Sequence, residues 1–182
     1  MVRVKASLDI QADPEAVFSL VTDVARKARL GPHAAVIGVS KETAGPVGVG
    51  TVFHYCLSIE GKIADYRTRC VAFEPGRMME TVSDTRPPFK VRVTVEPVPG
   101  GARLTQEETF SLPVLHMPVP GTKGWWGRVL HFIFGDADAI VQSRESSAAE
   151  DVAMQAKLEP KLADWLERIK THLEREQSRL ET

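Results

Sequence analysis

The chain opens with an alternating pattern that predicts a strand followed at once by a helix. Over residues 2–10 apolar side chains alternate with polar ones, which is the period of a half-buried β-strand. Asp13 can then cap a helix, and Pro14 suits the first helical position. Apolar residues recur at helical spacing up to Asp23, and a second, shorter helical stretch, broken by Gly31-Pro32, is expected over 24–35.

The middle of the chain is predicted to be a series of strands. They are expected over 36–43, 51–73 (a hairpin turning at Gly61-Lys62), 78–84, 89–96 and 102–112, with a hairpin loop over 97–101. Most of the turns between them are short, which requires antiparallel pairing. No strand–helix–strand rhythm repeats, so a doubly wound parallel sheet is not expected.

The predicted hairpin divides into an apolar face and a polar face. The apolar face carries Phe53, Tyr55, Leu57 and Ile59, set opposite Cys70, Thr68, Tyr66 and Ala64 in that order. The polar face carries His54, Ser58, Glu60, Asp65, Arg67 and Arg69. Such a division predicts one buried and one solvated face. Cys56 and Cys70 do not lie opposite each other in this register, so two free thiols are expected.

After residue 112 the pattern changes from strands to helices. Prolines and a glycine suggest a stiff connection, and Trp126, Val129, Leu130, Ile133 and Phe134 predict an extra helical segment. Residues 136–159 are polar and alanine-rich and are expected to be partly helical. Pro160 fits the first turn of a final helix that runs to about Leu180. That helix would be roughly 30 Å long, enough to cross a small sheet.

Strands followed by one long helix predict an α+β fold. The expected architecture is one domain over 1–182, with a curved antiparallel sheet wrapped around the final helix. Two short helices near the N-terminus complete it. The arrangement leaves room between sheet and helix for a small apolar molecule.

Four segments together resemble the START/Bet v1-like (SRPBCC) superfamily, and within it the polyketide cyclase/dehydrase-like branch. They are IQADPEAVFSLVTD, GPVGVGTVF, VAFEPGRMME and GGARLTQEETF, at 10–23, 45–53, 71–80 and 100–110. The resemblance implies a helix-grip fold whose cavity holds a hydrophobic ligand such as a lipid, polyketide, sterol or isoprenoid. It also implies that some relatives cyclise or dehydrate polyketides, whereas many only bind. No catalytic motif is shared, so no catalytic residue is assigned.

The connection over 113–159 is longer than the resemblance implies, and it is a candidate lid or an added packing element. Within it, Trp125 and Trp126 lie among apolar and basic residues. A helix docked over the mouth of the cavity is the preferred interpretation, and a helix at a membrane surface is the alternative.

The inward face supplies the candidate ligand-binding residues. They are Phe53, Tyr55, Leu57, Tyr66, Phe89, Val91, Leu104, Gln106, Glu108 and Phe110 on the strands, faced by Trp165 and Ile169 on the final helix. Aromatic walls with a few polar groups are typical of small-molecule sites. Ordinary core packing is the alternative for each residue, and a structural hydrogen bond is the alternative role for the two tyrosine hydroxyls.

Gln106 and Glu108 carry the sharpest chemical signal. If the alternation holds, both point inward, and a buried carboxylate has a raised pKa that suits it for proton transfer. The alternative is a one-residue bulge that turns Glu108 outward and Glu107 inward, or leaves both in solvent.

Composition and spacing argue against several other functions. The net charge of −1 gives no basic footprint for nucleic acid, and Arg26, Lys27 and Arg29 are interpreted as the solvated side of a helix. The histidines have no metal-ligand spacing, so neither a metal nor another cofactor is expected. No signal peptide or spanning segment is apparent, and a cytoplasmic protein is expected.

Three hypotheses of function follow. The first is binding of a small hydrophobic ligand between sheet and helix. The second is a cyclase or dehydratase in which Glu108 or Tyr66 moves a proton. The third is a protein-interaction module resembling the co-chaperones of the superfamily, which a solid core and an exposed apolar patch would favour. The oligomeric state and the ligand are left open.

Overall fold

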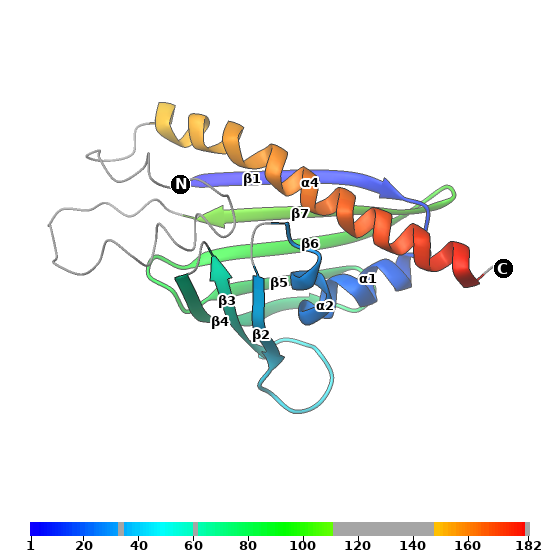
Figure 1. Ribbon diagram of the computed structural model, residues 1–182, viewed down its shortest axis with the longest axis horizontal. Helices are drawn as coiled ribbons and strands as arrows, with labels where there is room; N and C mark the ends of the chain where they lie inside the picture. Colours follow the sequence, from blue (N-terminus) through cyan, green and yellow to red (C-terminus); the bar gives the residue numbers. More distant parts are fainter. Residues whose placement is uncertain (33–34, 60–61, 111–147, 181–182) are drawn as a thin grey trace, which may run out of the picture.

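A seven-stranded antiparallel sheet covered by helices on one face forms the fold (Figure 1). The computed structural model describes residues 1–32, 35–59, 62–110 and 148–180. The strands are β1 (Val2–Ile10), β2 (Ala35–Lys41), β3 (Val52–Ile59), β4 (Lys62–Glu74), β5 (Met78–Ser83), β6 (Phe89–Val98) and β7 (Gly101–Phe110). Their spatial order is β1-β7-β6-β5-β4-β3-β2, which leaves β1 and β2 at the two edges.

Two short helices follow β1, as the sequence predicts. The Asp13 side chain accepts from the backbone N–H of Glu15 at 2.7 Å, and Pro14 begins α1 (Pro14–Thr22). Asp23 then accepts from the N–H of Arg26 at 3.1 Å and caps α2 (Val24–Arg29). This second helix ends at Arg29, just before the break that the sequence predicts at Gly31-Pro32.

The final helix, α4 (Ala148–Leu180), begins before the expected start at Pro160, which lies inside it. The prediction of that start was wrong because the proline was interpreted as a first-turn residue. A buried stripe continues through both halves of the helix: Met154, Leu158, Leu162, Leu166, Ile169 and Leu173. Burial of each such side chain contributes roughly 2 kcal/mol, and together these contributions outweigh the ~3 kcal/mol penalty of an internal proline. Residues 148–159 of the expected connection therefore belong to α4.

The rest of the candidate lid lies outside the described residues. That includes the segment around Trp125 and Trp126, with the extra helix predicted there. Among the helices that the structure does describe, none is long and apolar enough to cross a membrane.

The strand pairing preserves the predicted faces but shifts the predicted register of the first hairpin. Phe53 pairs with Thr68 and Tyr55 with Tyr66, two residues from the expected partners, because Ile59 pairs directly with Lys62. A shift of two residues returns every side chain to the same face, so the inward set is unchanged. Cys56 lies opposite Asp65, and both cysteines are free, as expected.

The last hairpin is longer than predicted. Pro97 pairs with Ala102 and Val98 with Gly101, so most of the expected loop belongs to β6 and β7. Only a tight turn is left, and Gly100 adopts a φ of +81° in it. Leu112, which was expected to extend β7, lies outside the described residues.

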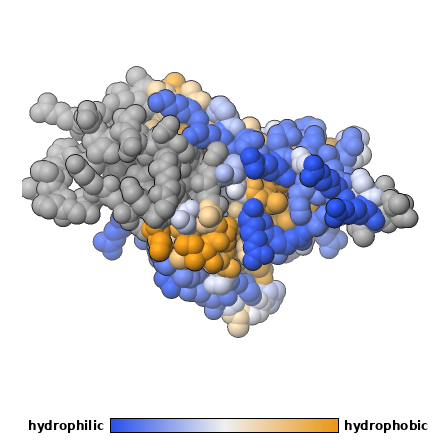
Figure 2. Space-filling model, in the orientation of Figure 1, coloured by the Kyte–Doolittle hydropathy of each residue, from blue (hydrophilic) through white to orange (hydrophobic). Residues whose placement is uncertain are grey.

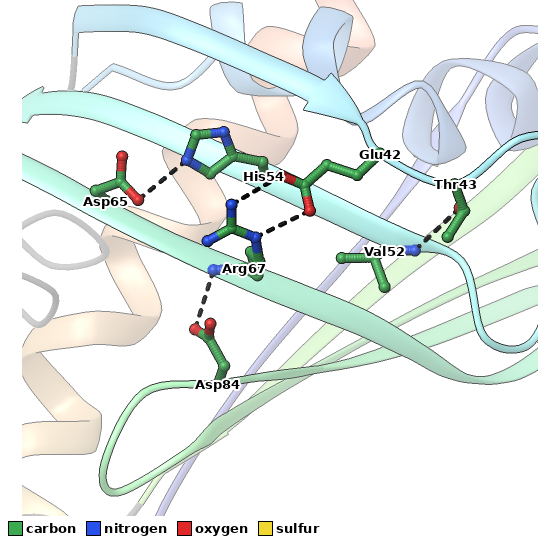
Figure 3. Close-up of polar contacts among 7 residues, drawn as sticks. All are labelled: Glu42, Thr43, Val52, His54, Asp65, Arg67 and Asp84. Carbon is green, nitrogen blue, oxygen red and sulfur yellow. Dashed lines mark hydrogen bonds and ion pairs between the residues drawn. The ribbon is translucent and has the colours of Figure 1, made fainter.

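Charged side chains occupy the outer face of the sheet (Figure 3). The Arg67 guanidinium donates to both carboxylate oxygens of Glu42 at 2.9 Å, and His54 Nε2 lies 3.0 Å from Asp65 Oδ1. Asp84 accepts from the backbone N–H of Arg67 at 3.0 Å. These pairs are solvent-exposed, so each contributes little to the stability of the fold. The outer face is thus the solvated one, as the sequence predicts.

The inner face carries two hydrophobic clusters beneath the helices. One includes Val17, Leu20 and Val21 of α1, and the other includes Leu158 and Leu162 of α4. Figure 2 shows hydrophilic side chains along the visible surface of α4 and apolar ones gathered below its middle. Tyr55 and Trp165 pack against both clusters. The boundary between the two clusters is where the core is incompletely filled.

Candidate functional site

A cavity lies between the inner face of the sheet and the helices α1, α2 and α4. The space that the centres of water molecules can occupy in it is about 70 Å³. This is room for about five waters or for a small organic group. Its lining is mostly apolar and comprises Val21, Val24, Lys27, Ala28, Tyr55, Tyr66, Thr68, Met79, Thr81, Phe89, Val91, Val93, Gln106, Glu108 and Trp165.

The structure divides the predicted site residues into two groups. Tyr55, Tyr66, Phe89, Val91, Gln106, Glu108 and Trp165 line the cavity. Phe53, Leu57, Leu104, Phe110 and Ile169 are fully buried in the two core clusters instead. Alternation along a strand reveals which face a residue occupies, but not how far along the strand the core is filled.

Glu108 points inward, because β7 pairs with both neighbours without a bulge. It lies opposite Val4 of β1 and Val91 of β6 and is 3% exposed. The adjacent Glu107 faces out and lies 3.2 Å from the Arg3 guanidinium. The structure therefore resolves the alternatives left open by the sequence in favour of Glu108.

Gln106 and Glu108 form a buried polar pair with unused capacity. The side-chain amide of Gln106 donates to Glu108 Oε1 at 2.5 Å. Gln106 Oε1 and Glu108 Oε2 are buried and have no hydrogen-bond partner in the described part of the chain. Burial raises the pKa of Glu108 to about 7, against the opposing effects of the Gln106 hydrogen bond and of the positive charge on Lys27.

Lys27 also lines the cavity, although the sequence suggested a solvated position. It is 8% exposed, whereas its neighbours Arg26 and Arg29 are exposed as expected. Its ammonium lies 5.2 Å from the centroid of the Trp165 ring, a cation–π contact. Burial lowers the pKa of Lys27 to about 8, and the negative charge of Glu108 opposes this shift.

The signal that could have identified Lys27 is its spacing from Val24. Residues three apart on a helix share a face, and Val24 is an apolar residue at the start of α2. The inward face of this short helix therefore includes Lys27. The other lining residues that the sequence analysis missed are Val21, Val24, Ala28, Thr68, Met79, Thr81 and Val93.

Aromatic rings form one wall of the cavity. Tyr55 and Tyr66 stack with centroids 5.1 Å apart, and Phe89 meets Tyr66 edge-on at 5.4 Å. Burial raises the pKa of both tyrosines, so neither ionises near neutral pH. Trp165 adds a buried indole N–H that has no acceptor among the described residues.

The sequence comparison decides the family. Residues 1–174 match the family described as "Polyketide cyclase / dehydrase and lipid transport". The chain belongs to this family. A comparison with curated proteins gives no significant match.

Solved structures of other proteins share the fold. An aromatase/cyclase from Streptomyces sp. R1128 is 15% identical with a TM-score of 0.60, covering 95% of this chain and 93% of its own. A START superfamily protein from Mycobacterium smegmatis is 13% identical with a TM-score of 0.61, covering 95% and 97%. A Polyketide_cyc-like protein from Corynebacterium glutamicum is 23% identical with a TM-score of 0.58, covering 96% and 93%. The predicted superfamily and fold are confirmed.

The chemistry available at the site is that of a carboxyl group and an amine in an apolar pocket. No group of three or more potential metal ligands occurs among the residues that the structure describes. Glu108 and Lys27 both change protonation near neutral pH, and both lie beside unfilled space. The site can thus bind a polar end group and exchange protons with it.

Proposed function

We propose that the protein binds a small, mostly apolar molecule with one polar end in the cavity between the sheet and α4. The observation that supports this proposal best is a set of polar atoms in an apolar pocket that have no hydrogen-bond partner among the described residues: Gln106 Oε1, Glu108 Oε2 and Trp165 Nε1. Natural proteins rarely leave such atoms unsatisfied, because each costs about 1–3 kcal/mol. A ligand atom that accepts a hydrogen bond would satisfy the indole N–H, and a ligand O–H or N–H would satisfy the two oxygens.

The apolar lining would supply most of the affinity. Burial of apolar ligand surface contributes about 25 cal/mol per Å², and the polar groups would fix the orientation of the ligand. The family description includes lipid transport, and the structural relatives include an aromatase/cyclase, so both binding and catalysis are consistent with the fold.

Native mass spectrometry of the purified protein tests the proposal. We expect an excess mass that disappears on denaturation, and fragmentation of the released molecule would identify its chemical class. Val93→Phe should reduce the bound fraction, because Val93 lines the cavity and a phenyl ring would fill it. The control is Val71→Phe on β4, where the side chain is 42% exposed. A bare native protein, or equal loss in both variants, would count against the proposal.

A second candidate function is catalysis of cyclisation or dehydration, and the Glu108 environment favours it. A carboxyl group whose pKa is about 7 is suited to giving and taking a proton near neutral pH. If the captured molecule is turned over, Glu108→Gln should lower the rate about a hundredfold while affinity stays nearly unchanged. The assay compares single-turnover rates with dissociation constants, and parallel loss of both would indicate binding alone.

The interaction-module hypothesis receives less support. A solid core would favour it, whereas a cavity lies between the two hydrophobic clusters.

A further inference from the structure

We infer that the ligand is a monocarboxylate with an apolar body, and that its carboxylate pairs with Lys27 and accepts from the Trp165 N–H. This inference rests on the proposed function and assigns the ligand's chemical class. Lys27 has no hydrogen-bond or ion-pair partner among the described residues, apart from the aromatic face of Trp165. On the same side of the cavity as Lys27, the buried indole N–H of Trp165 has no acceptor among the described residues.

Around the cavity, two hydrogen-bond donors lack an acceptor among the described residues. Lys27 and Trp165 can only donate, and neither has an acceptor among the described residues. Gln106 already uses one N–H to hold Glu108. A carboxylate offers two oxygens with about four acceptor sites, enough for the ammonium, the indole and one further donor. With a neutral amide or alcohol, the ammonium would have only the ionised form of Glu108 as a counter-charge among the described residues.

Glu108 is the third partner, and its protonation state matters. An ionised Glu108 would repel a bound carboxylate, whereas the protonated form can donate a hydrogen bond from its unpartnered oxygen. Binding of the anion should therefore favour protonation of Glu108. Burial already raises the pKa of this carboxyl group to about 7, so only a small further shift is needed near neutral pH.

The titratable groups that line the cavity come from four elements. They are Lys27 on α2, Tyr55 on β3, Tyr66 on β4 and Glu108 on β7, and α4 contributes the uncharged Trp165. The tyrosines stay neutral, because burial raises the pKa of each. From pH 6 to pH 8.5, Glu108 loses its proton and then Lys27 loses its charge. Both changes oppose the anion, so affinity should fall throughout this range.

Calorimetric titration with 2-naphthoate and 2-naphthamide tests the inference, because the two probes share size and shape but differ in charge. At pH 7 we expect the carboxylate to bind about tenfold more tightly. Comparison of phosphate and Tris buffers should show net uptake of protons. Lys27→Met should abolish the preference for the carboxylate. Glu108→Gln should keep the preference but remove the proton uptake, since glutamine mimics the protonated form.

Arg26→Met is the matched control. Arg26 lies next to Lys27 on α2 but is exposed and pairs with Glu176 at 2.9 Å, so its loss changes net charge equally without touching the cavity. A preference that Arg26→Met also abolishes, or that survives in Lys27→Met, would overturn the inference. Equal affinity for both probes would overturn the carboxylate assignment and leave the proposed function standing. Failure of both probes to bind, with a bare mass in the native spectrum, would overturn both.

Discussion

Lys27→Met is expected to increase the free energy of unfolding by about 3 kcal/mol at pH 7. In the native protein, burial lowers the pKa of Lys27 from 10.5 to about 8, and each pKa unit corresponds to about 1.4 kcal/mol. Methionine has a similar length and no charge, so it fills the same space without the desolvation penalty. Loss of the attraction to Glu108 should matter little, because Glu108 can take up a proton.

The effect should depend on pH in a defined direction. The folded pKa of Lys27 lies below the unfolded one, so the penalty is full below pH 8 and disappears as the pH rises to 10.5. The folded pKa of Glu108 is raised from 4.5 to about 7, so its penalty is absent below pH 4.5 and full above pH 7. Together, the charges of Lys27 and Glu108 lower the free energy of unfolding most between pH 7 and 8.

Urea denaturation followed by circular dichroism at pH 6, 7.5 and 10 measures this effect. The difference between Lys27→Met and the wild type should be largest at the two lower values and small at pH 10. Arg26→Met is again the control, because this arginine is exposed and its ion pair contributes little. If Lys27→Met is less stable than the wild type at pH 7.5, the prediction is contradicted. The charge of Lys27 would then be stabilised by interactions other than the described contacts.

Retention of two destabilising charges in one cavity is itself informative. Charged groups are rarely buried unless they are paired, and perturbed titrations concentrate at functional sites. A purely structural core at this position would be more stable with apolar side chains. The electrostatic penalty therefore supports a ligand that interacts with Lys27 and Glu108, as proposed above.

Most of the fold was predictable because its signals are local. The alternation in β1 and in the β3–β4 hairpin indicates which face is buried, and the Asp13 cap defines the start of α1. Part of the site follows from the same reasoning. Gln106 and Glu108 occupy alternate positions on β7, so a strand without a bulge had to place both inward.

The remaining features depend on tertiary packing, which a local pattern does not contain. Lys27 lies in a short run of basic residues, and only the docking of α2 over the cavity buries it. The start of α4 was missed because proline is usually a first-turn residue, and the buried stripe from Met154 onward overrides that preference. Which inward residues line the cavity and which fill the core depends on how much space the two hydrophobic clusters occupy. The sequence pattern does not contain this information.

Gly101→Ala is expected to lower the free energy of unfolding by about 3 kcal/mol or more. A methyl group at this position would lie 2.0 Å from the carbonyl oxygen of Ile10 and 3.0 Å from its carbonyl carbon. Both atoms belong to the backbone of β1, so no side-chain rotation can relieve the clash. The strands would have to separate where Ile10 pairs with Ala102.

Gly38→Ala provides the matched control, because Gly38 is also in a strand and a methyl group there meets nothing within 4 Å. We expect little change in this variant, since added side-chain volume is tolerated in open space and glycine loses more chain entropy on folding. Urea denaturation of both variants measures the difference. A strong loss in Gly101→Ala alone would show that the second glycine of the Gly100-Gly101 pair serves close strand approach, whereas the first serves the turn. Equal stability of the two variants would show that the β1–β7 edge can relax, and would contradict this role for Gly101.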